Sequence, residues 1–212
     1  MRPIRRVLAV GAHTDDIEMG CGGTLARIRR EVPDAKITVV ALSRAEASLP
    51  PGSAPDRLET EFRNSMRHLG DVEVIALQYA VRVMDSHRQA ILDDLIKIRQ
   101  SVDPDLIFTH ATSDTHQDHV VTSQESVRAF RGRTLLGYEA PWNQTTSSAS
   151  LRIVLEDDDV ACKVRMVTEY KSQIELGRLY VNDEFVRGFA SYRGAQAKTR
   201  YAEGFELIYG TL

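Results

Sequence analysis

Two kinds of apolar pattern alternate along the chain. Short runs that are apolar throughout are typical of strands buried on both faces, whereas apolar residues at every third or fourth position are typical of a helix with one buried side. The continuous runs predict strands at residues 7–12, 36–42, 72–77, 104–110, 134–139 and 149–156. The wider spacing predicts helices at residues 17–31, 56–69, 86–102 and 116–130, and a further helix that begins at residue 157.

This alternation predicts an α/β fold. Strands that alternate with helices form βαβ units, which build a Rossmann-like, mainly parallel sheet flanked by helices on both faces. Ligands of open parallel sheets bind beyond the carboxyl ends of the strands, so we expect the active site there. The segment 182–212 mixes short helix and strand signals. The chain shows no internal repeat and no clear domain boundary, which predicts a single domain over residues 1–212.

Composition and charge narrow the class of protein. The formal net charge of −3 gives no sign of a nucleic-acid-binding or polybasic membrane surface. No apolar run approaches the roughly 18 residues of a membrane-spanning helix. The two cysteines, Cys21 and Cys162, do not make a disulfide framework in 212 residues, so the expected location is the cytoplasm. The oligomeric state stays open, a homo-oligomer included.

The first predicted strand runs into the segment "GAHTDDIEMGCGG", residues 11–23. His13, Asp15 and Asp16 lie within four positions of one another there. Ionisable groups are costly to desolvate unless something pairs with them, and a bound cation would do so. The glycines resemble part of a nucleotide-binding loop, but they lack its spacing. We interpret them as allowing the start of the helix to pack closely, with Cys21 as a small packed residue.

A second polar cluster, "THATSDTHQDHVVT", follows the strand predicted at 104–110. Parallel strands point the same way, so both clusters are expected at one edge of the sheet. Two imidazoles and one carboxylate hold a zinc ion and leave a position open for water, which is the layout of a catalytic zinc site. We expect His110 to be a packed, hydrogen-bonded residue, and Asp114 or Thr115 to cap the next helix.

The roles within each cluster stay open on the residues alone. Asp15 and Asp16 are neighbours, so their side chains point in different directions, and one can bind the metal while the other faces the water. His116 and His119 divide in the same way.

At these motifs the chain resembles the LmbE-like, or PIG-L, zinc-dependent N-deacetylases. Their first motif is usually His-Pro-Asp-Asp, here "AHTDDIEMGCGGTL", and their second is usually His-Pro-Asp-His, here "HQDHVVT". The resemblance continues through "DRLETEFRNSMRHLG", "YKSQ" and "YAEGFELI". It implies a Zn²⁺ ion, or another divalent metal such as Fe²⁺, bound by His13, Asp16 and His119. It also implies that Asp15 is the general base, that His116 stabilises the oxyanion and protonates the leaving amine, and that Asp118 supports a neighbour.

The sequence departs from the family at several points. Thr14 and Gln117 replace the two usual prolines, and "LSRAEAS" stands where many members carry Thr-Arg-Gly-Glu, with Arg44 retained and the glycine absent. Arg44 and Glu139 are candidate substrate-binding residues because each lies at the carboxyl end of a predicted strand. The Pro- and Ser-rich segment Ser43–Pro55 is a candidate lid.

Three function classes follow. The first is a zinc hydrolase that removes an acetyl group from a small N-acetylated sugar or sugar conjugate of the N-acetylglucosamine type. The second is an amidase of the same family that acts on a non-sugar or larger acyl amide. The third is a non-enzymatic nucleotide-binding protein, which leaves the histidines unexplained. A non-haem iron oxygenase could also use two histidines and a carboxylate, but the expected fold would then be an all-β barrel.

Overall fold

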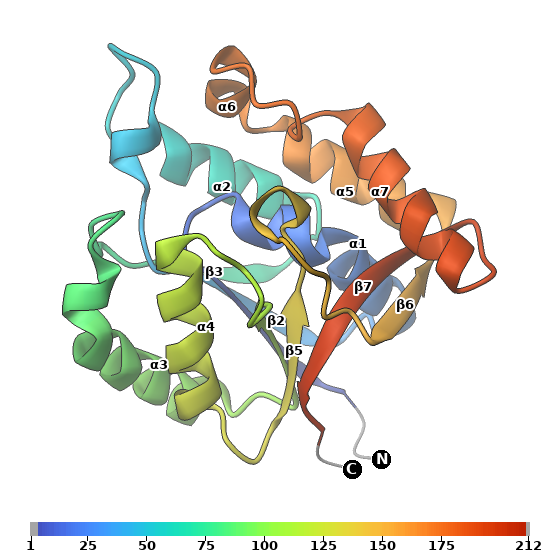
Figure 1. Cartoon of the computed structure of the whole chain (residues 1–212), viewed down its shortest axis with the longest axis horizontal. Coiled ribbons are helices and arrows are strands. Elements are labelled where there is room, and N and C mark those ends of the chain that lie inside the picture. Colours follow the sequence, from blue (N-terminus) through green and yellow to red (C-terminus); the bar gives the residue numbers. More distant parts are fainter. Residues whose placement is uncertain (1–3, 211–212) are drawn as a thin grey trace.

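The computed structural model describes residues 4–210 and contains one seven-stranded sheet in the order β3-β2-β1-β4-β5-β7-β6 (Figure 1). The strands are β1 Arg6–Gly11, β2 Lys36–Ala41, β3 Val72–Ala76, β4 Leu106–His110, β5 Thr134–Tyr138, β6 Leu151–Leu155 and β7 Tyr201–Tyr209. Neighbours from β3 to β5 pair in parallel, and β7 pairs antiparallel with both β5 and β6. The predicted α/β, mainly parallel architecture is therefore confirmed.

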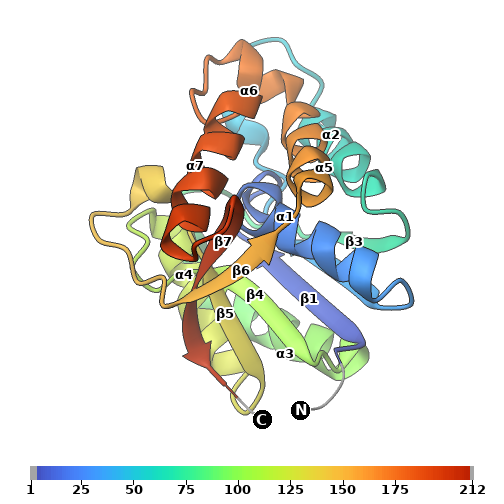
Figure 2. The same ribbon diagram turned by 90° about the vertical axis from the view of Figure 1, so that its right-hand side faces the viewer.

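Helices cover both faces of this sheet. The helices are α1 Asp16–Glu31, α2 Arg57–Arg67, α3 Arg88–Val102, α4 Gln117–Ala129, α5 Asp157–Thr168, α6 Lys171–Glu175 and α7 Asp183–Gln196. Short 3₁₀ turns lie at Glu46–Ser48, Met84–His87 and Pro141–Asn143. Figures 1 and 2 show α3 and α4 on one face and α1, α2, α5 and α7 on the other. No helix within residues 4–210 is long and apolar enough to cross a membrane.

The central strands are apolar throughout because each of their faces packs against a helix layer. In β1, Val7 and Ala9 join the cluster beneath α1, α2 and α5, whereas Leu8 and Val10 join the cluster beneath α3 and α4. All four side chains are fully buried. This two-sided burial explains why the strands appear in the sequence as unbroken apolar runs rather than as an alternating pattern.

The strand order places a crevice between β1 and β4. From β1 the chain crosses through α1 to β2 on one side, and from β4 it crosses through α4 to β5 on the other side. The two connecting loops diverge at the carboxyl ends of adjacent strands, which is the position where open α/β sheets bind ligands. Both polar clusters of the sequence lie in these loops.

The glycines after β1 are explained by packing. A Cβ atom on Gly20 would come within 2.1 Å of the Tyr138 ring, and one on Gly23 would come within 2.6 Å of Leu155. The backbone N–H groups of Gly23 and Thr24 donate to the Glu203 carboxylate, which restarts the helix after a kink at Cys21. These contacts bring α1 close to the sheet, as expected, and they account for the glycines without a phosphate ligand.

The last third of the chain is where the sequence pattern was least informative. The segment 182–212 carries α7 and the nine-residue β7, which inserts between β5 and β6. Its last two residues lie outside the described range. The helix predicted at 116–130 begins at Gln117, and its cap is His116 rather than Asp114 or Thr115.

Candidate metal centre and active site

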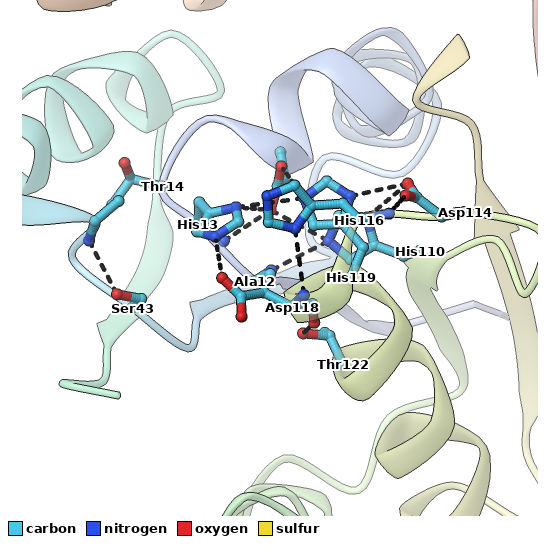
Figure 3. A network of polar contacts seen from close by, with 12 residues as sticks. Ala12, His13, Thr14, Ser43, His110, Asp114, His116, Asp118, His119 and Thr122 are labelled. Carbon is cyan, nitrogen blue, oxygen red and sulfur yellow. Dashed lines mark hydrogen bonds and ion pairs between the residues drawn. The ribbon is translucent and has the colours of Figure 1, made fainter. Parts of the chain in front are cut away.

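The loops after β1 and β4 bring four predicted residues into contact, and Figure 3 labels three of them, His13, His116 and His119. His13 and Asp16 come from the first loop and the start of α1, and His119 comes from the first turn of α4. The ring of His116 lies over these three groups, with its centroid 4.4 Å from that of His119 and 5.1 Å from that of His13. The fold therefore joins the two motifs, which are about a hundred residues apart in the sequence.

The side chains of His13, Asp16 and His119 form a triangle in which each Asp16 oxygen faces one of the two histidines. His13 Nδ1 lies 3.3 Å from His119 Nε2 and 3.4 Å from Asp16 Oδ2, and His119 Nε2 lies 3.3 Å from Asp16 Oδ1. A tetrahedral zinc ion bound at about 2.0–2.1 Å requires donor atoms about 3.3–3.4 Å apart. The spacing between each pair of these side chains is therefore suitable for a zinc ion held by His13, Asp16 and His119.

A second aspartate stands behind each histidine of the triangle. Asp118 Oδ2 lies 3.0 Å from His13 Nε2, and Asp114 Oδ2 lies 2.8 Å from His119 Nδ1. Asp118 in turn accepts hydrogen bonds from the backbone N–H of Arg82. A carboxylate on the remote nitrogen fixes the ring's orientation and tautomer, and it raises the basicity of the nitrogen that faces the metal.

The electrostatics of the triangle favour positive charge. Burial opposes protonation of His13, but the Asp16 carboxylate outweighs it and raises the pKa of His13 to about 10. Asp16 acts in the same way on His119, whose pKa rises to about 9. Burial also opposes ionisation of Asp16, yet the surrounding histidines hold its pKa well below the usual range. A divalent cation would take the place of these protons.

Asp15 stands beside the triangle and lines the cavity above it. Burial, followed by the nearby charge of Asp16, raises the pKa of the Asp15 carboxyl. A raised pKa brings the carboxyl closer to neutral pH, where a group can both accept and release a proton. Asp15 is therefore suited to proton transfer next to a hydrolytic centre.

His116 is held by the first turn of α4. Its Nδ1 accepts a hydrogen bond from the backbone N–H of Asp118 at 3.2 Å, so the proton of the neutral ring is on Nε2. Burial and the neighbouring histidines lower the pKa of His116, which favours this neutral form. Among the described residues, two groups have donor atoms close enough to share a metal ion: His116 with His13 and His119, and Asp16 with His110 and His119.

His110 has more contacts with the site than the sequence indicated. His110 is fully buried, stacks on His119 with ring centroids 3.8 Å apart, and has its Nε2 3.1 Å from Asp16 Oδ2. The backbone N–H of Ala12 donates to the same nitrogen. His110 is thus packed and hydrogen-bonded as expected, and burial lowers its pKa to about 4. The sequence feature that could have indicated the contact between His110 and Asp16 is the place of His110 at the last position of β4, the strand next to β1.

The cavity above the triangle has a volume of about 230 Å³. It is lined by residues that include His13, Asp15, Asp16, Ala45, Ser48, Arg82, His116, Asp118, His119, Trp142, Asn143, Gln173, Arg178 and Tyr180. Arg82, Arg178 and Tyr180 were not singled out in the sequence because they lie in loops with no recognisable motif. Trp142 and Tyr180 stack face to face with ring centroids 4.1 Å apart.

The structure brings neither Arg44 nor Glu139 to this cavity. The Nε atom of Arg44 pairs with Glu59 at 2.9 Å on the neighbouring helix α2. Glu139 is buried and pairs with Arg193. Each side chain forms an ion pair with a residue of another element, and these ion pairs hold both side chains away from the cavity.

The Ser43–Pro55 segment contacts the site through two residues. Ala45 and Ser48 line the cavity, and the Ser48 carbonyl accepts a hydrogen bond from Gln173 Nε2 at 3.2 Å. A gating role for this segment stays a prediction.

Comparison with known proteins identifies the family. The family described as PIG-L, GlcNAc-PI de-N-acetylase, matches residues 8–130. The chain belongs to the PIG-L family. Over 172 residues it is also 30% identical to the uncharacterized deacetylase YaiS of Escherichia coli K12, covering 78% of this chain and 90% of that protein. The expectation of a metal-dependent N-deacetylase is thereby confirmed at the level of the PIG-L family.

Solved structures share the fold at lower identity. The N,N′-diacetylchitobiose deacetylase of Pyrococcus horikoshii superposes with a TM-score of 0.80 at 18% identity, covering 98% of this chain and 85% of that one. GalB, the 4-carboxy-2-hydroxymuconate hydratase of Pseudomonas putida KT2440, also superposes with a TM-score of 0.80, at 20% identity and covering 98% of both chains. A deacetylase and a hydratase thus share this fold, so the reaction has to be argued from the site.

Proposed function

We propose that this PIG-L family member is a zinc-dependent hydrolase that removes the acetyl group from a small N-acetylated sugar or sugar conjugate of the N-acetylglucosamine type. The observation that supports it most is the triangle of His13, Asp16 and His119, whose donor atoms are 3.3–3.4 Å apart at the base of a cavity that Asp15 and His116 also line. A bound zinc ion would supply a Lewis acid and lower the pKa of water toward about 7.

The residues around the triangle supply the proton transfers. Asp15 is the general base and accepts the proton of the attacking water on its carboxylate. The Nε2–H of His116 donates to the amide carbonyl oxygen and stabilises the negative charge that develops there. The C–N bond then breaks, and the departing amine takes the proton that Asp15 accepted from the water, which returns Asp15 to its carboxylate form. His116 keeps its Nε2 proton, because a neutral ring that gave it up would be left as an imidazolate, so the proton donor is Asp15 rather than the His116 that the resemblance implies. Asp118 and Asp114 hold the rings of His13 and His119 in position throughout.

The size of the cavity supports a small acyl group. At about 230 Å³ it lies below the ~300–1,000 Å³ typical of sites for drug-sized ligands, and the stacked Trp142 and Tyr180 offer a flat wall for a sugar ring. This favours the acetyl hypothesis over the amidase alternative with a larger acyl group. The packing role of Gly20 and Gly23 removes the main support for nucleotide binding.

Acetate release tests the proposal. The protein is stripped with a chelator, reloaded with zinc or Fe²⁺, and incubated with N-acetylated sugars, nucleotide sugars and thiol-sugar conjugates, alongside matched N-butanoyl analogues. We expect release only from metal-loaded protein, and faster release of acetate than of butanoate. Absence of acetate from every substrate after metal is restored would contradict the proposal, and preferred release of the larger acid would favour the amidase alternative.

A further inference from the structure

The carboxylate of Asp15 is held differently from the other carboxylates of the site. Among residues 4–210, no other residue donates a hydrogen bond to it, and it does not cap the start of α1. By contrast, the backbone N–H of His13 donates to Asp16 at 2.7 Å, and the backbone N–H of Arg82 donates to both oxygens of Asp118. The direction of the Asp15 carboxylate therefore depends on the peptide that leads into this residue.

Tyr170 holds that peptide. Its hydroxyl contacts the carbonyl oxygen of Thr14, which belongs to the peptide bond between Thr14 and Asp15. Tyr170 is 1% exposed, stands immediately before α6 and is 156 positions from Thr14 in the sequence. It begins the "YKSQ" segment, to which the proposed mechanism gives no part. This segment thus reaches the residue that precedes the general base.

Glu18 stands behind the Tyr170 hydroxyl. Its carboxyl is fully buried, forms no ion pair among the described residues, and has its Oε1 2.5 Å from that hydroxyl. A hydroxyl carries one hydrogen and a carbonyl oxygen can only accept, so Tyr170 donates to Thr14. The contact with Glu18 needs a second hydrogen, which a neutral carboxylic acid supplies. The result is a chain of hydrogen bonds from Glu18 through Tyr170 to the Thr14 carbonyl.

We propose that Tyr170 is a positioning residue, whose hydroxyl fixes the peptide between Thr14 and Asp15 and thereby directs the Asp15 carboxylate into the cavity. Glu18 supports the hydroxyl from the other side. This role rests on the proposed function, in which Asp15 transfers protons. Tyr170 does not line the cavity and acts only through its neighbour. Proton transfer requires close placement of the two groups, and a displacement of about 1 Å can lower a rate by about 100-fold.

The metal ligand next to Asp15 has contacts of its own. Asp16 accepts the backbone N–H of His13, and its Oδ2 lies 3.1 Å from His110 Nε2. These contacts do not involve Tyr170. Loss of the Tyr170 hydroxyl should therefore lower turnover and leave zinc affinity unchanged.

Tyr170→Phe is compared with Tyr138→Phe, the matched control. Tyr138 is also buried, and its hydroxyl donates to the Val10 carbonyl of β1 at 2.9 Å. Each variant loses one buried hydrogen bond to a backbone carbonyl, so a general loss of stability affects both. We expect Tyr170→Phe to lower kcat about 10–100-fold with KM and zinc affinity unchanged, and Tyr138→Phe to retain kcat. Equal kcat in the two variants would overturn the proposal.

A double-mutant cycle separates positioning from a structural role. Asp15→Asn protein has no base left to position, so adding Tyr170→Phe to it should cause little further loss of kcat. Loss by the same factor with and without Asp15 would show that Tyr170 does not act through it. Glu18→Leu should lower kcat as Tyr170→Phe does. Glu18→Gln should recover most of that loss, because its amide N–H replaces the acid O–H. Equal losses in both Glu18 variants would contradict the part assigned to Glu18.

Crystal structures of the wild type, Tyr170→Phe and Tyr138→Phe give a readout that does not depend on activity. We expect the Asp15 carboxylate to change its orientation, or to adopt more than one, in Tyr170→Phe only. An unchanged Asp15 in Tyr170→Phe overturns the proposal even if the wild type releases acetate. A displaced Asp15 supports it even if the wild type releases none, and in that case the deacetylase assignment fails alone.

Discussion

The carboxylate of Asp114 lies 2.8 Å from Nδ1 of His119, and its other oxygen accepts the backbone N–H of His116 at 2.9 Å. One side chain therefore orients a candidate metal ligand and also fixes the start of the segment that carries both histidines. In the sequence, Asp114 stands just before a predicted helix, and for this reason the pattern indicated only a helix cap.

Asp114→Asn should weaken zinc binding about 10–100-fold, the usual effect of removing the carboxylate behind a metal-bound imidazole. The amide keeps the shape of the side chain but does not carry the charge that makes His119 more basic. Competition with a chelator of known affinity measures the change. The control is Asp158→Asn, at an exposed position at the start of α5. Equal zinc affinity in both variants would show that Asp114 has no part in the site.

Asp15→Asn and Asp16→Asn should fail in different ways, because one carboxylate transfers a proton and the other binds the metal. Asp15→Asn should retain zinc and lose about 10²–10⁴ in turnover, the scale for loss of a general base. Asp16→Asn should lose zinc together with activity. Metal content and turnover are measured on the same preparations. If Asp15→Asn loses the metal while Asp16→Asn keeps it, the two roles are exchanged.

The two histidines of the second motif should also differ in whether their substitution removes the metal. His116→Ala should keep zinc and lose turnover, since its ring donates to the substrate, and His119→Ala should lose zinc, since its Nε2 completes the triangle. Elemental analysis and acetate release are the measurements. Zinc loss in His116→Ala would instead favour the donor group made by His13, His116 and His119.

Zinc binding by the metal-free protein should release about two protons near neutral pH. The pKa of His13 is raised to about 10 and that of His119 to about 9, so both rings are protonated before the metal enters. Because both pKa values are raised, the stabilisation that these rings give the metal-free fold is complete below their unfolded pKa near 6.5. It is lost as the pH rises through about 9 to 10.

Calorimetry in buffers of different ionisation enthalpy counts the protons that are released when zinc binds. Zinc affinity should also increase with pH up to this range. Zinc binding without proton release would show that the rings are neutral in the metal-free protein.

Tyr170→Phe should lower the free energy of unfolding by about 1–3 kcal/mol. The Tyr170 hydroxyl contacts the Thr14 carbonyl and lies 2.5 Å from Glu18 Oε1, a fully buried carboxyl whose pKa burial raises to about 8. Phenylalanine keeps the ring but leaves these oxygens without a partner. Urea unfolding measures the change, with Tyr192→Phe at an exposed position as the control. Equal stability of the two variants would contradict the prediction.

Ala45→Gly should leave stability unchanged or increase it by up to about 1 kcal/mol. Ala45 adopts φ +55° at the position where many family members carry glycine, so the substitution relieves strain that offsets the loss of its buried methyl group. The matched substitution Ala26→Gly, inside α1, should cost about 1 kcal/mol. Thermal unfolding of both variants is the test, and a similar loss in each would show that Ala45 is not strained.

The sequence by itself determined the α/β architecture and the chemical content of the site. Strands β1, β2 and β4 bury both faces, so their apolar runs are continuous and visible without a structure. His13, Asp16, His116 and His119 stand within short motifs directly after two strands, and parallel strands end at one edge. Local spacing was therefore enough to predict that these four residues meet.

The tertiary structure alone decided which residues surround that site. Arg44 and Glu139 follow strands as a substrate-binding residue would, but Glu59 and Arg193 pair with them instead. Arg82 and Arg178 reach the cavity from loops without a motif, and β7 pairs between β5 and β6 although it is the last strand of the chain. These cases have one physical reason in common. Ion pairs, loop positions and the order of antiparallel strands depend on contacts between segments that are far apart in the chain. A local pattern of apolar and polar residues does not encode such contacts.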